Sequence, residues 1–164
     1  MREILFRGKR VVNGEWVEGN FCMSALEQQR GLCGVDGYIR LYDSNKGKME
    51  AYEVDRETVG QYTGLKDKNG KRIFEGDIVI TQPFSDRPYS KKAKFKQHIG
   101  VVRYDVRHYK SIHDEHEQDY KAAWDVDIKD YGGYGCCSWS AFYKCEVIGN
   151  IHDNPELMEV EQHD

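Results

Sequence analysis

Turn-forming residues interrupt this chain at short intervals, and this feature most limits the folds that it can adopt. Asn13-Gly14 lies between two β-branched stretches, and both residues tolerate the positive φ of a two-residue hairpin turn. Polar residues 43–47 form a second turn signal between two strand-like stretches, and residues 67–71 form a third. With the short strand-like stretches beside them, these turn spacings suggest a barrel or sandwich.

Composition also favours strands, because Val and Ile together number 23 whereas Leu and Ala number 12. We therefore predict an all-β, mainly antiparallel domain, either barrel-like or made of packed sheets. Short helices are predicted at residues 23–30 and 155–160. The predicted strands include residues 36–42, 49–55, 76–80, 99–106, 122–128 and 142–151. The predicted core consists of Trp16, Phe74, Ile78, Ile80, Val101, Trp124, Val126, Val147 and Ile151.

A chain of 164 residues has the length of one domain, so residues 1–164 are predicted to form a single domain. A long polar arm or set of loops is expected to protrude from it at about residues 81–121. The sequence has no apolar run near 18–20 residues and no signal-peptide core, so we expect a cytoplasmic protein without membrane contact. Its five cysteines are expected to be reduced and mostly buried.

The protruding region carries a basic stretch, residues 87–96, which is the candidate nucleic-acid contact. If strands 99–106 and 122–128 pair, we expect this stretch and the acidic residues 114–119 to leave the same end of the sheet. The favoured interpretation is that the two segments neutralise each other, within one molecule or across a dimer. The alternative is that the basic side chains contact phosphates. These side chains are Arg87, Lys91, Lys92, Lys94 and Lys96.

Three histidines near the acidic residues, His108, His113 and His116, are the best metal-ligand candidates. Such a site needs helical spacing or a fixed framework, and the segment 108–119 offers neither in its sequence. We therefore favour a solvated polar loop, with weak metal binding as the alternative, and predict no bound metal or cofactor. No nucleophile motif and no phosphate-binding loop occurs, so no catalytic residue is assigned and catalysis is not expected.

Three segments together resemble the YopX-like family of phage and prophage proteins: residues 1–8, residues 61–79 (QYTGLKDKNGKRIFEGDIV) and residues 146–157 (EVIGNIHDNPEL). The resemblance spans nearly the whole chain in the expected order. It implies a mostly β fold and a phage or prophage gene product in the bacterial host cytoplasm. It brings no activity, and physically the motifs are typical of turns, strand entries and a helix start.

The predicted function is that of an uncharacterised, non-enzymatic accessory protein that works through protein contacts. Self-association is the expected partner relationship, through the segment between Pro83 and Lys110, with an unknown phage or host protein as a further partner. The first alternative is a nucleic-acid-binding module that uses residues 87–96, and the second is a weak metal site at 108–119. The acidic total charge, −4, argues against the first, but a local basic patch can still bind phosphate.

Overall fold

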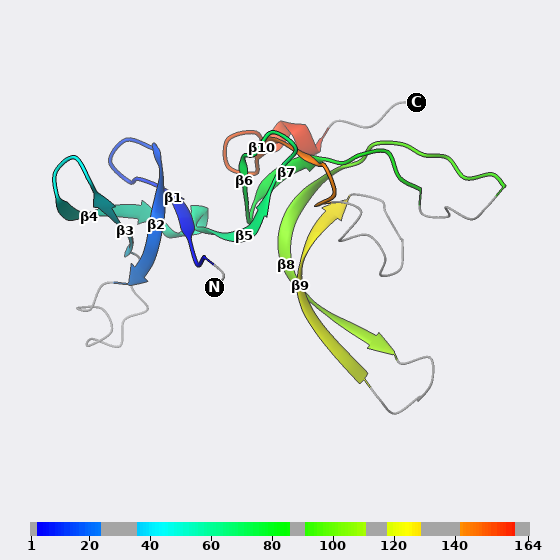
Figure 1. Cartoon of the computed structure of the whole chain (residues 1–164), viewed down its shortest axis with the longest axis horizontal. Helices are drawn as coiled ribbons and strands as arrows, with labels where there is room; N and C mark the ends of the chain where they lie inside the picture. The colour runs from blue at the N-terminus through cyan, green and yellow to red at the C-terminus, as the bar shows by residue number, and fades with distance from the viewer. Residues whose placement is uncertain (1–2, 24–35, 86–90, 111–117, 129–141, 160–164) are drawn as a thin grey trace. The chain divides into compact units, whose positions relative to one another are not determined.

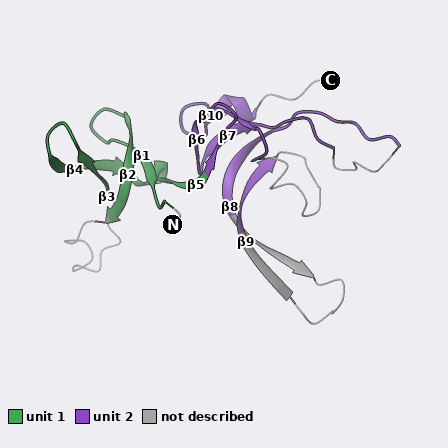
Figure 2. Cartoon of the chain, in the orientation of Figure 1, with its two compact units in different colours: residues 1–64 green, residues 65–164 purple. Residues whose placement is uncertain are grey.

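The computed structural model consists of antiparallel strands joined by turns (Figure 1), arranged in two compact units, residues 1–64 and 65–164 (Figure 2). The helix predicted at 23–30 lies outside the described residues, except for Met23, which ends a strand. The structure describes residues 3–22, 37–85, 91–104, 123–128 and 142–159, and the backbone alone at 23, 36, 105–110 and 118–122.

The first unit is an antiparallel sheet whose strands follow the order β4-β3-β2-β1-β5. The hairpin predicted around residues 43–47 is confirmed, because β3 and β4 pair along their whole length and Gly47 takes a φ of 64°. The elements are β1 (Phe6–Lys9), β2 (Trp16–Met23), β3 (Asp36–Asp43), β4 (Lys48–Asp55), the 3₁₀ turn η1 (Arg56–Thr58) and β5 (Gly60–Lys66).

The turn at Asn13-Gly14 joins β1 and β2 as predicted, but the prediction of a two-residue loop is wrong. The last strand pair is Lys9 with Trp16, so six residues form the connection, and Gly14 within it has a φ of 70°. Arg10 donates a backbone hydrogen bond of 2.9 Å to the Glu15 carbonyl across this connection and also forms a β-bridge with Val54 of β4. This bridge brings the end of β1 against the far strand of the sheet, so the sheet is strongly curled.

Small residues let the strands of this unit approach closely around buried Ile39 and Val54. A Cβ atom added at Gly19 would lie 2.4 Å from the carbonyl oxygen of Arg40, which is closer than such atoms can pack. Gly8 faces the side chains of Val54 and Ile39 in the same way. The glycines in β1 and β2 are therefore explained by packing as well as by turn formation.

The second unit contains a sheet of order β10-β7-β8-β9, and β6 neighbours β5, the strand in which the first unit ends. The strands predicted at 99–106 and 122–128 pair with each other as part of a longer β8–β9 ribbon. The elements are β6 (Arg72–Phe74), β7 (Asp77–Ile80), β8 (Ile99–Lys110), β9 (Gln118–Ile128), β10 (Glu146–Asn150) and the 3₁₀ turn η2 (Pro155–Met158).

Two predicted elements of this unit are shorter than expected. The strand predicted at 142–151 covers only β10, because residues 143 and 144 form a turn in which Lys144 has a φ of 50°. The predicted C-terminal helix is the 3₁₀ turn η2, which begins at Pro155 as expected. Asn154 precedes it without a side-chain capping hydrogen bond, and this weak start is consistent with a single short turn.

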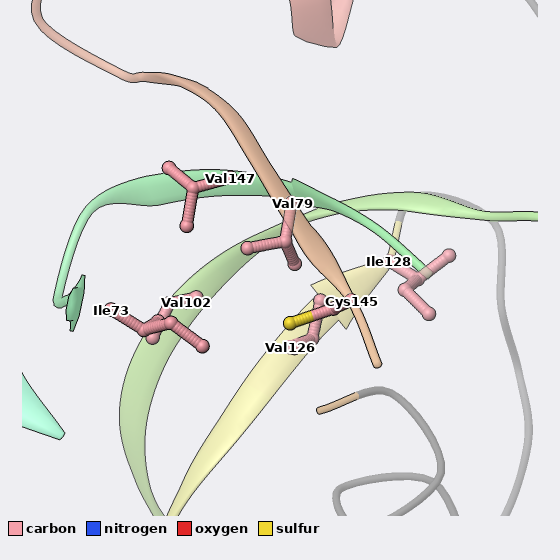
Figure 3. Packing of buried hydrophobic residues seen from close by; sticks show 7 residues of the cluster. All are labelled: Ile73, Val79, Val102, Val126, Ile128, Cys145 and Val147. Atoms are coloured by element: carbon pink, nitrogen blue, oxygen red, sulfur yellow. The ribbon is translucent and has the colours of Figure 1, made fainter. Parts of the chain in front are cut away.

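The core of the second unit gathers side chains from β6 to β10 (Figure 3), comprising Ile73, Val79, Val102, Val126, Ile128, Cys145 and Val147. Of the predicted core residues, Phe74, Ile78, Val101, Val126 and Val147 are buried, whereas Trp16, Ile80, Trp124 and Ile151 are half-buried. The prediction of an all-β, mainly antiparallel fold is confirmed, and the strands that the structure describes form no closed barrel. No helix in the described residues is long and apolar enough to cross a membrane.

Candidate functional site

The connection between β7 and β8 extends their hairpin into a projection that we call the basic arm, residues 81–98 (Figure 1). Next to the last sheet pair, the Thr81 N–H donates to the His98 carbonyl at 2.9 Å, and the His98 N–H donates to the Thr81 hydroxyl at 3.0 Å. Further out, Phe84 and Lys96 exchange two backbone hydrogen bonds of 3.0 and 3.2 Å. The root of the arm is thus hydrogen-bonded from both strands.

Side chains also fix this root to the second unit. Phe84 packs against the hydrophobic core cluster, and its ring centroid lies 4.5 Å from that of buried His98. The Gln82 side-chain amide donates a hydrogen bond of 3.1 Å to the Lys144 carbonyl. Sequence reasoning missed Gln82 and His98, because their roles depend on the register of the arm and on a turn more than 40 residues away. These contacts fix the base of the arm to the second unit.

Beyond this root, the described arm presents exposed basic side chains. Phe95 stands among them with 60% of its surface exposed. Arg87, the fifth basic candidate, lies outside the described residues. Within the part of the chain that the structure describes, Lys91, Lys94 and Lys96 form no ion pair. The exposed lysines of the arm are Lys91, Lys92, Lys94 and Lys96.

The expectation that the basic stretch and the acidic residues 114–119 leave the same end of the sheet is wrong. Gly100 pairs with Ile128 at one end of the β8–β9 ribbon, and Lys110 pairs with Gln118 at the other. The arm enters β8 at the first end, whereas the β8–β9 connection leaves at the second. An extended strand rises about 3.3 Å per residue, so the two ends are roughly 35 Å apart along β8. Because of this register, the geometric reason for expecting the basic stretch and the acidic residues to neutralise each other within one sheet no longer holds.

The metal candidates are not brought together in the described residues. His108 lies in β8 and pairs with Tyr120, while His113 and His116 fall outside the described part of the chain. Among the described side chains, no group of three His, Cys, Asp or Glu residues could hold a metal ion. The side chains of residues 108–119 lie outside the described ones, so weak metal binding by this loop stays a prediction.

A buried carboxylate, Asp67, organises the turn predicted at residues 67–71. Its two oxygens accept backbone N–H groups from Asn69 at 2.8 Å, Lys71 at 2.9 Å and Val147 at 3.1 Å. Burial alone would raise the pKa of Asp67, but the three N–H donors outweigh it and hold the pKa below its usual value. The turn residues were predicted, whereas the long-range bond to β10 carries no sequence signal.

The buried cysteine of the second unit has the properties of a structural thiol. Burial raises the pKa of Cys145 to about 11, so it stays protonated at neutral pH. Cys22 in the first unit is half-buried and also forms no disulfide. Cys33, Cys136 and Cys137 lie outside the described residues, so the prediction of reduced thiols stays a prediction for them.

Comparison with known proteins identifies the family of this chain. The family model described as "YopX protein" matches residues 5–159. The chain belongs to the YopX family. Among solved structures, it is similar to protein EF1440 from Enterococcus faecalis, with 22% identity over 96% of this chain and 99% of that one and a TM-score of 0.45. No curated protein sequence matches it.

The two main segments that resemble other YopX-family proteins meet in space. Asp67 belongs to the segment 61–79, and its partner Val147 belongs to the segment 146–157. Beside this bond, the Lys68 ammonium forms an ion pair with Glu146, and the Asn69 amide is 3.4 Å from the same carboxylate. These contacts join the β5–β6 turn to β10. The interpretation of the motifs as folding signatures thus has a direct structural basis in this YopX-family chain.

Proposed function

We propose that this YopX-family protein is a non-enzymatic binding module whose basic arm contacts the phosphate backbone of nucleic acid. The observation that carries the proposal is the group of four exposed lysines on an arm whose root is held to the sheet. The register of β8 and β9 favours this function over internal neutralisation, because it separates the arm from the acidic connection. A net charge of −4 is compatible with it, since binding depends on the local potential.

The lysines of the arm are expected to give salt-dependent binding to nucleic acid. Four neutralised phosphates predict that log K falls with log salt with a slope of about −3 to −4. The dissociation constant should lie between roughly 1 and 100 µM at physiological salt, the range of non-specific binding. Fluorescence anisotropy of a labelled oligonucleotide at several salt concentrations measures both quantities. The test variant replaces Lys91, Lys92, Lys94 and Lys96 by alanine and should abolish this binding.

A matched control separates the arm from the total charge of the protein. In this control variant, alanine replaces four exposed lysines outside the arm, so the net charge changes by the same amount. These lysines are Lys48, Lys66, Lys68 and Lys71. This control should retain most of the affinity and the slope. Equal losses in the two variants would show that binding depends on total charge, and the proposal for the arm would then fail.

Self-association is a second candidate function, carried by the edge of the sheet in the second unit. β9 is eleven residues long and, within the described part of the chain, pairs with β8 on one side only. A long edge strand offers unpaired backbone groups that a second copy can use. We expect sedimentation velocity to show dimers or larger species at micromolar concentration. A single monomeric species across a concentration series would contradict this candidate.

The biological setting remains part of the proposal. A phage or prophage origin and a place in the bacterial host cytoplasm, both implied by the family resemblance, would put the arm in reach of phage and host nucleic acid. Co-sedimentation of the untagged protein with the nucleic acid of a cell extract would support this setting if nuclease treatment of the extract abolishes it. Its recovery in the membrane fraction would contradict it.

A further inference from the structure

The position of Phe95 distinguishes the basic arm from a simple cluster of lysines. Lys96 forms a backbone β-bridge with Phe84, which fixes the chain next to Phe95. Phe84 packs against the core cluster, whereas Phe95 is 60% exposed. The fold thus turns one aromatic ring of the arm inward and the other outward.

An exposed apolar side chain is ordinary on a protein surface, so exposure alone says nothing about a ligand. Phe95 differs in its neighbours, since it lies directly between Lys94 and Lys96, and both lysines are exposed. Cationic side chains next to an aromatic ring form the combination with which proteins hold single-stranded nucleic acids. The lysines contact the phosphates, and the ring stacks on a base.

We infer that the basic arm takes single-stranded nucleic acid, with Phe95 stacking on an unpaired base while the flanking lysines contact the backbone. This inference rests on the proposed function and adds the class of nucleic acid. In a duplex, each base is already stacked between its neighbours, so its face is closed to a side chain. In a single strand the faces are open to any aromatic ring, and the contact tolerates any base sequence.

The experiment compares a labelled single strand of about 12 nucleotides, a length within known site sizes, with the duplex of the same sequence. Binding of the full chain is measured by anisotropy at two salt concentrations. Phe95→Ala should weaken single-strand binding by about 5- to 100-fold, which corresponds to the loss of one base–aromatic stack. Duplex binding and the salt slopes should stay unchanged, because no lysine is removed.

Three further variants define the chemistry of the contact. Phe95→Trp should retain single-strand binding because it keeps an aromatic face, whereas Phe95→Leu should lose it although it keeps an apolar side chain. Tyr42→Ala is the matched control, since Tyr42 is 62% exposed in the first unit and lies outside the arm. It should leave both affinities unchanged. Thermal unfolding of each variant verifies that the fold is retained, and Phe95→Leu gives a second test in case Phe95→Ala is destabilised.

The outcomes separate this inference from the proposed function. If neither oligonucleotide binds, the proposed function fails and the inference fails with it. If both bind and Phe95→Ala weakens neither, or weakens both equally, the inference alone is overturned and the lysines remain the contact. Binding of phosphatidylglycerol vesicles that Phe95→Ala abolishes, without an effect on the single strand, would also overturn the inference and would identify the ring as a lipid contact.

Discussion

Replacing Ile78 by alanine is expected to lower the free energy of unfolding by about 2–5 kcal/mol. Ile78 lies in β7 and has no exposed surface. It is paired in register with Val101 of β8, which is also buried. Truncation removes apolar contacts and leaves a cavity that strands on both sides of β7 keep open, because β7 pairs with β8 and β10. Chemical denaturation monitored by fluorescence or circular dichroism measures the change.

The same substitution at Ile148 is the matched control for this prediction. Ile148 lies in β10, and 36% of its surface is exposed. Ile148→Ala should cost less than half as much as Ile78→Ala, since it removes less buried area and creates no closed cavity. Equal effects would show that the packing around Ile78 is not as described.

Ile39→Ala extends this experiment to the prediction that residues 1–164 form a single domain. Ile39 is fully buried in the first unit, whereas Ile78 belongs to the second. A single cooperative domain predicts one unfolding transition that both variants shift. Two transitions, each shifted by one variant only, would contradict the single-domain prediction.

Replacing Asp67 by alanine is expected to cost about 2–4 kcal/mol, because it leaves three backbone N–H donors without their acceptor. One of these donors belongs to Val147, so the change also loosens β10 from the β5–β6 turn. Asp67→Asn should cost less, since an amide oxygen can still accept some of these bonds. Denaturant unfolding of the two variants and the unchanged protein measures both effects.

Asp127→Ala is the control for loss of a carboxylate. Asp127 is exposed and forms a 3.3 Å ion pair with Arg103, so its removal should cost at most about 1 kcal/mol. If Asp127→Ala and Asp67→Ala had the same effect, the hydrogen bonds of Asp67 would not contribute to stability as the geometry indicates.

The pH dependence of the Asp67 effect has a defined sign. The pKa of Asp67 is lower in the folded protein than its usual value of 3.8, so ionisation of this group stabilises the fold above that pH. This contribution is lost as the pH falls through the lowered folded-state pKa. The stability difference between the unchanged protein and Asp67→Asn should therefore narrow in acid. A difference that is constant from neutral pH to pH values below the usual pKa would contradict this assignment.

The sequence by itself indicated where most of the described strands and turns lie, although not the length of every turn, strand and helix. Residues that tolerate positive φ mark the connections at 13–14, 43–47 and 67–71, and β-branched side chains mark the strands between them. These signals are local because they arise from the backbone preferences of single residues. They were enough to predict a mainly antiparallel all-β fold. The family motifs could be found in the same way, since each is a continuous segment.

Only the tertiary structure determined which distant segments meet. The bond from Val147 to Asp67 spans 80 residues, and no pattern near either residue predicts it. The register of β8 and β9 decided that the basic arm and the acidic connection lie at opposite ends of the ribbon. Packing placed Phe84 against the core cluster and left Phe95 exposed to solvent. Pairing register and burial depend on contacts between residues far apart in the chain, and local preferences of the backbone leave them open.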